Sequence, residues 1–491
     1  MYNEFQRVYE WVRYDGEGNE VAPPWVRTEK DLAAKNKIKI DRQWLYRQFC
    51  EDHHILISEK GNMFFYESGR YLFRNKREVQ ALIKRYLPVD YRTPWHWEEI
   101  YKEFESSPPN MKESQFDAQE GIINFTNGLL ILEADRLKPH SSKYFSLRQI
   151  PCNYRPGLTL DDAPVFKQYL NDLIGNDKEA GKFLLEYIGA ILSNVPGWRF
   201  KKLLVLVGEG NTGKTQLREL VMKLIGEEHC IAIDIPQIQT RFGPIQLYQK
   251  RLAGSGDMAN ARLDEVNLIK NLTGGDSVFA EPKGKEGFSF RYDGFLWFNA
   301  NKLPYFRGDR GDHVYERFIV VRCPNVVSKE KRDPHLLDKL IEEKEAIVSV
   351  AITHLREAIA QGYEFTESET MRWEREKYVI ANNSLLTFVK SCCVFGDYNL
   401  FAWELNLSEP KKKKMLRSKF HQVYKKWCQL NDVKPERLKD IPAQMEKHFG
   451  LAPYKTGGEY VYDISLTENA IDELGDDYDS YNQSQSYSRK Y

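Results

Sequence analysis

The 491-residue chain lacks several features that would assign it to a specific class of protein. It has no run of 18 or more apolar residues, so no membrane-spanning helix and no membrane partner are expected. Its first residues, MYNEFQRVYEWVRYDGEG, lack the basic and then apolar pattern of a signal peptide, so we expect a cytoplasmic protein. Its formal net charge is zero, so total charge does not predict a polyanionic partner.

Cysteine usage excludes two further classes. The seven cysteines include no CxxC pair and their number is odd, which argues against a disulfide framework and against a zinc ribbon. Cys50, His53 and His54 are one weak candidate for a metal site. No second cluster accompanies them, so the favoured interpretation is ordinary side chains near a helix end.

Length and local composition predict several domains. At roughly 150 residues per domain the chain is long enough for about three. Apolar residues make up 42% and charged residues 29%, which is typical of globular domains with sizeable cores. We expect an α+β N-terminal region for oligomerisation or an accessory role (1–115), a second domain (116–195), a nucleotide-binding core (196–365), a C-terminal domain (370–470) and a disordered tail (471–491).

Periodicity predicts the main elements. Apolar spacings of three and four residues indicate helices over 29–50, 77–87, 164–194, 334–363 and 367–395. Short alternating segments over 55–73 and 122–154 indicate strands joined by turns. Residues 418–466 follow the order helix, turn, helix and hairpin, which fits a winged helix.

The strongest motif is a glycine-rich loop at 208–215, GEGNTGKT. It matches GxxxxGK[ST] between an apolar strand and a helix, where backbone N–H groups can wrap phosphates. Lys214 is expected to reach the outer phosphates of ATP, and the Thr215 hydroxyl to bind Mg²⁺. The positions expected to bind nucleotide are Gly208, Gly210, Asn211, Thr212, Gly213, Lys214 and Thr215.

Later segments supply candidates for the rest of a hydrolytic site. RLAGSGDM (251–258) is a strand that ends in Asp257, a candidate second Mg²⁺ ligand. FLWFNA (295–300) is a buried strand followed by Asn301, which is placed to orient the attacking water. Arg310 and Arg317 lie beyond it, and one of them is expected to reach the γ-phosphate in a neighbouring subunit.

A positively charged hairpin lies between these segments. Lys283, Gly284 and Lys285 form its expected tip, after LTGGD at 272–276. In order, the glycine loop, the strand acid, LTGGD with the basic hairpin, ANKLP (300–304) and YERF (315–318) resemble the signature motifs of superfamily 3 helicases. With INFTNG, LKPH and IP upstream, the chain is more closely similar to the phage/plasmid primase-associated and poxvirus branch of that superfamily. Its layout is similar to the replication initiator helicases of staphylococcal pathogenicity islands.

The resemblance implies an α/β AAA+ P-loop ATPase core that assembles as a homohexamer and translocates on single-stranded DNA. It implies that Asp257 is the Walker B acid, Asn301 the sensor, Arg317 the finger, and Lys283 or Lys285 the DNA-gripping residue. Two positions depart from the pattern: Gly256 precedes the Walker B acid and Glu316 precedes the finger. Activation of the water therefore stays open, with Asp264, Glu265 and Asp276 as further candidates.

A second DNA contact is expected in the C-terminal domain. Residues 411–450 hold twelve lysines and arginines against four acidic residues. Lys419, Lys425 and Lys426, with Tyr424 and Trp427 between them, are candidates to bind duplex origin DNA. The alternative is a solvated charged face.

The leading hypothesis is an ATP-dependent replicative helicase and replication initiator of a mobile genetic element in a bacterial host. One alternative is a helicase–primase, but residues 1–115 show no convincing acidic pair for priming. Another is an ATP-switched origin-binding protein that does not translocate. Recruitment of host primase or polymerase is left open, because no residue points to it.

Overall fold

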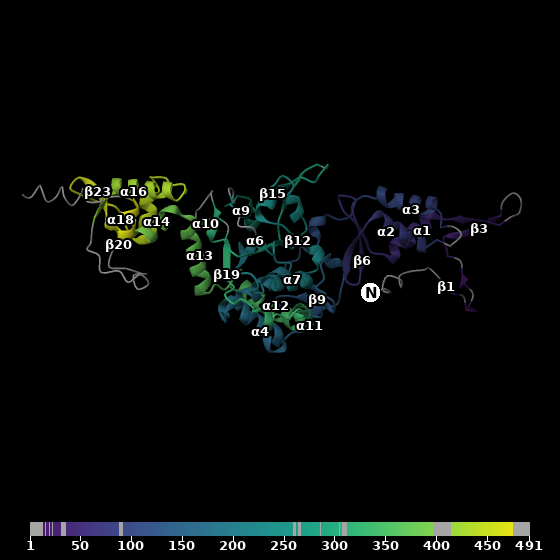
Figure 1. Ribbon diagram of the computed structural model, residues 1–491. Coiled ribbons are helices and arrows are strands. Elements are labelled where there is room, and N and C mark those ends of the chain that lie inside the picture. Colours follow the sequence, from purple (N-terminus) through teal and green to yellow (C-terminus); the bar gives the residue numbers. More distant parts are fainter. Residues whose placement is uncertain are drawn as a thin grey trace, which may run out of the picture.

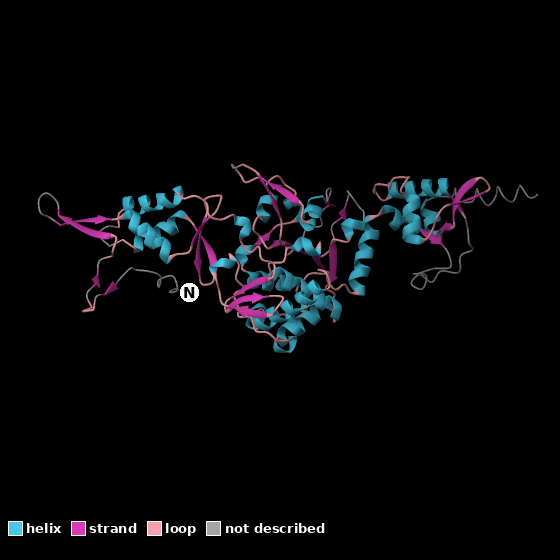
Figure 2. Cartoon of the chain, turned by 180° about the vertical axis from the view of Figure 1, so that it is seen from behind, coloured by secondary structure: helices cyan, strands magenta, loops and turns pink. Residues whose placement is uncertain are grey.

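The computed structural model describes residues 13–14, 16–18, 20–21, 23–30, 36–87, 92–258, 262–263, 267–284, 286–303, 305–306, 312–395 and 414–474. An N-terminal region and a C-terminal region lie on opposite sides of a central α/β body (Figure 1). The view from behind shows the same separation (Figure 2). Within these residues, no helix has the length and apolar character needed to cross a bilayer.

The N-terminal region packs helices against short antiparallel strands. Its main elements are β3 (Val26–Lys30), β4 (Asn36–Ile40), α1 (Arg42–Asp52), β5 (Ile55–Ile57), β6 (Met63–Glu67), β7 (Arg70–Arg74), α2 (Lys76–Arg85) and α3 (Pro94–Ser106). The strands expected over 55–73 and the helix over 77–87 are confirmed. The prediction of one helix over 29–50 is wrong, because β3 and β4 pair as a hairpin. Helix α1 starts only after Asp41, whose carboxylate caps it by accepting from the Trp44 N–H.

The tryptophans and histidines of the N-terminal region differ in how deeply they are buried. Trp25 is fully buried, and its indole N–H donates to the Tyr86 carbonyl oxygen. Trp44 is 43% exposed, and Trp11 lies outside the described residues. His53 is buried and shares a hydrogen bond with the Tyr86 hydroxyl. In the described part of the chain, no three His, Cys, Asp or Glu side chains gather as metal ligands.

The next segment joins a small sheet to two helices. Its elements are β8 (Ile122–Phe125), β9 (Gly128–Ile131), β10 (Arg136–Lys138), α4 (Pro164–Ile174) and α5 (Lys178–Leu192). The predicted strands over 122–154 are confirmed. The prediction of one continuous helix over 164–194 is wrong, because α4 and α5 are separate helices. Gly175 ends α4 in the left-handed conformation, and the Asp177 carboxylate caps α5. The turn between them leaves α4 free to pack beside the glycine-rich loop.

The central body is built on five parallel strands. They are β11 (Leu203–Val207), β12 (Cys230–Ala232), β13 (Leu252–Gly254), β17 (Phe295–Ala300) and β19 (Phe318–Arg322). Their order across the sheet is β12–β13–β17–β11–β19. Strand β17 therefore lies between the strand before the glycine-rich loop and the strand before Asp257. The expected α/β core with a parallel sheet is thus confirmed, and its strand order is consistent with a P-loop core.

Both faces of this sheet are covered, which explains its nearly continuous apolar strands. Leu204, Leu206 and Trp297 point into a core shared with α4, α5, α7 (Lys214–Ile225) and α12 (Lys344–Ala360). Leu203, Val205 and Phe298 point into a second core on the other face. Parallel strands place their carboxyl ends at one edge, and the loops after β11, β13 and β17 meet there.

A hairpin and a C-terminal bundle complete the chain. Helix α9 (Asn267–Gly274) leads into the antiparallel hairpin of β15 (Ser277–Ala280) and β16 (Phe288–Arg291), which projects from the central body (Figure 1). Three further helices lie at the central body: α10 (Asp312–Tyr315), α11 (Leu336–Glu342) and α13 (Glu369–Asn382). The C-terminal elements are α14 (Ser384–Cys392), β20 (Cys393–Phe395), β21 (Met415–Leu416), α16 (Arg417–Leu430), α17 (Ile441–Phe449), β22 (Tyr454–Thr456), β23 (Glu459–Tyr462), β24 (Ile464–Leu466) and α18 (Glu468–Leu474). Helix α18 extends past the boundary expected at residue 470, and residues 475–491 lie outside the described chain.

Candidate nucleotide site

A cavity of about 1330 Å³ opens where β11, β13 and β17 end. Three loops from the sheet line it: 210–216 after β11, Gly256 and Asp257 after β13, and Ala300 and Asn301 at the end of β17. Helix α4 and the segment after β19 form its other walls. The position agrees with the general rule that ligands of parallel α/β sheets bind beyond the carboxyl ends of the strands.

The glycine-rich loop is fixed from several sides. The Gly208 N–H donates to the Ala300 carbonyl at 3.2 Å, and the Val327 N–H donates to the Asn211 carbonyl at 2.9 Å. The Tyr169 hydroxyl of α4 donates to the Gly213 carbonyl at 2.8 Å. Helix α7 begins directly after the loop, at Lys214. Its first N–H groups and its dipole favour an anion at this end.

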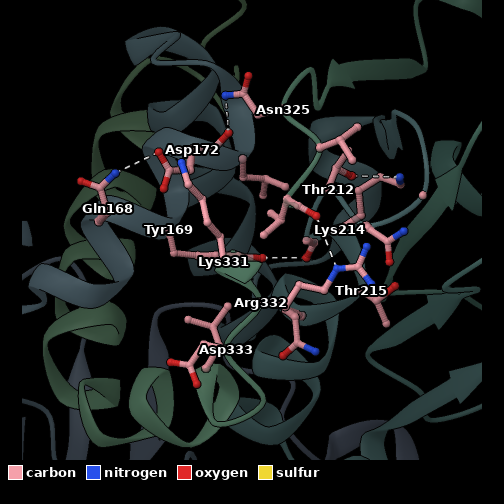
Figure 3. A pocket seen from close by; sticks show the side chains of 18 of the residues that line it. Gln168, Tyr169, Asp172, Thr212, Lys214, Thr215, Asn325, Lys331, Arg332 and Asp333 are labelled. Atoms are coloured by element: carbon pink, nitrogen blue, oxygen red, sulfur yellow. Dashed lines mark hydrogen bonds between the residues drawn. The ribbon is translucent and has the colours of Figure 1, made fainter. Parts of the chain in front are cut away.

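The Lys214 side chain is buried within the loop (Figure 3). Its ammonium donates to the carbonyls of Gly208 and Glu209, each at 2.7 Å, and to the Thr212 hydroxyl at 3.1 Å. Burial lowers the pKa of Lys214, and nearby Cys323 and Asp257 only partly offset that effect. A buried ammonium held by neutral carbonyls gains from a negatively charged partner, so the environment suits a phosphate group.

Thr215, in the first turn of α7, and Asp257, in the loop after β13, line the same cavity. A Cβ atom on Gly256 would lie 4.0 Å from the Thr215 methyl carbon, so the loop after β13 passes beside Thr215. The Asp257 carboxylate is exposed to the cavity. A hydroxyl and a carboxylate suit Mg²⁺, which prefers oxygen ligands and retains several waters. Asn301, at the end of the intervening strand β17, lines the same cavity.

The second wall contains residues that the motifs did not reveal. Helix α4 contributes Gln168, Tyr169 and Asp172, and the segment after β19 contributes Asn325, Val326, Val327, Lys331, Arg332 and Asp333. The Asn325 side chain donates to the Asp172 carbonyl at 2.8 Å, which joins the two parts of the wall. Figure 3 shows the Arg332 side chain pointing into the cavity toward the glycine-rich loop. These residues carry no local signature, because only the tertiary fold brings them to the loop.

Arg317 lies at the opposite end of the sheet from the glycine-rich loop. It directly precedes β19, and its carbonyl accepts from the Leu203 N–H at the start of β11. Its guanidinium donates to the Thr273 hydroxyl at 2.8 Å. The negative charge of Asp276 raises the pKa of Arg317, although burial lowers it overall. Arg317 therefore does not line the cavity of its own chain. Asp276 lies with Arg317 and not in the cavity, whereas Asp264, Glu265 and Arg310 lie outside the described residues.

The described DNA-binding candidates do not line the cavity. Lys283 is exposed at the tip of the β15–β16 hairpin, and Lys285 lies outside the described residues. Lys419, Lys425 and Lys426 lie on α16, where the Lys426 ammonium donates to the Leu474 carbonyl at 2.5 Å. Tyr424 and Trp427 belong to the buried C-terminal core, so the idea that they lie between the lysines on a DNA-facing surface is wrong.

The glycine loop offers a matched pair of substitutions. A Cβ atom on Gly208 would lie 2.3 Å from the Cys323 carbonyl oxygen, which belongs to the backbone, whereas one on Gly210 meets nothing within 4 Å. Gly208→Ala should force the loop apart at a cost of ~1–3 kcal/mol, which weakens ATP binding by roughly tenfold or more. Gly210→Ala leaves the loop geometry intact and should weaken ATP binding less than Gly208→Ala does. Titration of a fluorescent ATP analogue measures both, and equal affinities for the two variants would contradict this loop geometry.

Comparisons with known proteins cover two parts of the chain. Residues 5–175 match a family model described as "D5 N terminal like", and residues 206–317 match a "Family of unknown function (DUF5906)". One apo structure of the NrS-1 C-terminal region is 15% identical, with 86% of this chain and 99% of that chain covered and a TM-score of 0.45. A second, of its residues 305–718, is 14% identical, with 87% and 100% covered and a TM-score of 0.44. The chain therefore has a D5-like N-terminal part, followed by a segment that matches the family of unknown function and contains the end of β11 and the parallel strands β12, β13 and β17.

Proposed function

We propose that the protein is an ATP-driven DNA helicase of the AAA+ superfamily 3 type that initiates replication of a mobile genetic element. The observation that carries the proposal is the placement of Asn301 between the glycine-rich loop and Asp257, at the end of the strand that separates β11 from β13. A polar side chain there can orient water against a phosphate held by Lys214. The D5-like match upstream of this core supports the same assignment.

The cavity supports ATP and Mg²⁺ as ligands. Lys214 and the loop N–H groups would hold the phosphates, while Thr215 and Asp257 would hold Mg²⁺. Bound Mg²⁺ would neutralise charge on the phosphate oxygens during hydrolysis. Arg332 adds a positive charge from the second wall, directed toward the loop. Besides Asp257, the cavity is lined by the acidic residues Asp172 and Asp333.

The position of Arg317 supports the proposal of a ring assembly. Its guanidinium is half-buried at the sheet edge opposite the cavity of its own chain, beside Thr273 and Asp276. Burial lowers the pKa of Arg317, although Asp276 raises it. Its distance from its own cavity supports a role at the site of a neighbouring subunit. We therefore assign it as a finger in trans within a homohexamer.

The C-terminal elements support a winged-helix DNA-binding domain. Strand β21 precedes α16 and α17, and it pairs with β23, which also pairs with β22. In this fold the second helix enters the major groove. That position belongs to α17, with the exposed Lys447 and His448, and the adjacent wing carries Lys455. We propose that these residues read duplex origin DNA and that the exposed lysines of α16 contact backbone phosphates.

The hairpin gives the first functional test. Lys283→Ala should leave basal ATP hydrolysis within about twofold and reduce unwinding of a forked duplex by roughly tenfold or more, because a phosphate contact at the projecting tip is lost. Lys223→Ala, at an exposed position on α7, is the matched control. Retained unwinding in the Lys283 variant would show that the hairpin tip does not grip DNA.

A further inference from the structure

A buried carboxylate joins the N-terminal region to the central body. Glu113, in a short 3-10 turn (η2, Glu113–Gln115), is only 5% exposed. One oxygen accepts from the Ser58 hydroxyl at 3.0 Å and from the Asn62 side chain at 2.6 Å. The other accepts from the Lys60 ammonium at 3.0 Å. Because Ser58, Lys60 and Asn62 form the turn between β5 and β6, Glu113 organises one tip of the N-terminal sheet.

The same carboxylate reaches across to the central body. The Tyr248 hydroxyl donates to Glu113 at 3.0 Å and accepts from the Lys60 ammonium at 2.6 Å. The Gln249 side chain donates to Glu113 at 3.2 Å. Burial alone would raise the pKa of Glu113, but the hydrogen bonds from Asn62 and Lys60 lower it overall. The carboxylate therefore stays ionised, and charge-assisted hydrogen bonds of this kind are the stronger ones.

The ring of Tyr248 lies against the base of the hairpin. It packs edge-on against Phe288 at 5.0 Å and Phe290 at 5.4 Å between ring centroids. Both phenylalanines belong to β16, opposite Ala280 and Val278 of β15. The Lys60 ammonium also lies 4.7 Å from the Phe288 ring centroid. The N-terminal region thus meets the base of the hairpin at two side chains, directly through Lys60 and indirectly through the Tyr248 ring that Lys60 and Glu113 hold.

We propose that Tyr248 is a positioning residue that couples the N-terminal region to the DNA-contacting hairpin. Its hydroxyl is fixed by Glu113 and Lys60, while its ring supports Phe288 and Phe290. Displacement of the N-terminal region would remove that support and release the hairpin, so the N-terminal region governs how firmly the hairpin engages DNA. The statement that the hairpin engages DNA rests on the proposed function. The support of the hairpin by Tyr248 does not.

Two conservative variants separate this role from general packing. Tyr248→Phe keeps the ring against β16 and removes only the hydroxyl, and Glu113→Gln keeps the shape and removes the charge. Arg70→Gln is the matched control, because Arg70 makes a different contact between the two bodies, with Glu228 at 3.7 Å and away from the hairpin. Each full-length variant is compared with the wild type in amide hydrogen exchange over residues 277–291, in basal ATP hydrolysis and in hydrolysis stimulated by single-stranded DNA.

The proposal predicts faster exchange in the hairpin of the Tyr248 and Glu113 variants, by roughly fivefold or more, and wild-type exchange in the Arg70 variant. It also predicts that basal hydrolysis stays within about twofold while the DNA-stimulated part falls several-fold. Unchanged hairpin exchange in both variants, or an equal increase in the Arg70 variant, would overturn it. If the wild type shows no DNA stimulation, the proposed function fails, whereas the exchange measurement still decides the role of Tyr248.

Discussion

Lys214→Ala should reduce ATP hydrolysis by roughly 100-fold or more, because it removes the cation at the centre of the phosphate-binding loop. In the wild type that ammonium lies within 2.7 Å of two loop carbonyls and beside the Thr212 hydroxyl. In the proposed ATP complex, phosphate oxygens would replace these neutral partners. Steady-state phosphate release at saturating ATP and Mg²⁺ measures the effect.

Folding of the Lys214 variant should be preserved. Burial lowers the pKa of Lys214, so its charge does not stabilise the folded state and its removal carries no ionic penalty. Thermal unfolding of the two proteins without nucleotide is therefore expected to differ by only a few degrees. Hydrolysis at the wild-type rate by a folded Lys214 variant would exclude this cavity as the catalytic site.

Arg317→Ala should also reduce hydrolysis strongly, by roughly 10³-fold if it acts as a finger. The reason differs from that for Lys214, since Arg317 does not line the cavity of its own chain. Binding of ATP to the variant should stay within about twofold of wild type, because its own phosphate loop is intact. The measurements are phosphate release and titration of a fluorescent ATP analogue.

Mixing the two inactive variants tests whether Arg317 acts in trans. In a mixed ring, a subunit with intact Lys214 can meet a neighbour with intact Arg317, and that interface regains both groups. Equimolar mixing followed by reassembly should therefore restore a measurable part of the hydrolysis that each variant lacks. Lack of restoration, with assembly shown by light scattering, would place Arg317 outside the neighbouring site.

The P-loop core was predictable because its signals are local. A strand, a glycine-rich loop and a helix follow each other directly at 203–225, and the buried strand before Asn301 is apolar throughout. The end positions of parallel strands then bring Lys214, Asp257 and Asn301 to one cavity. These residues lie far apart in the sequence, but they meet because their strands end at the same edge of the sheet.

Other parts depended on tertiary contacts that no local pattern encodes. Helix α4 and the segment after β19 form the second wall through Asn325 and Val327, which bond to α4 and to the loop. Glu113, Lys60 and Tyr248 come from three separate segments and meet only in the folded chain. The charged residues before α1 suit either a helix or a strand, so their pattern predicts a helix, whereas the pairing of β3 with β4 makes the segment a hairpin.

Unwinding of a forked duplex tests the central claim most directly. Wild type and Lys214→Ala are compared with ATP and Mg²⁺ on forks that carry a single-stranded arm at either the 3′ or the 5′ end. The account predicts strand separation by the wild type from one of the two arms, and none by the variant. ATP hydrolysis by the wild type with no unwinding of either fork would contradict a translocating helicase and favour a DNA-bound ATP switch.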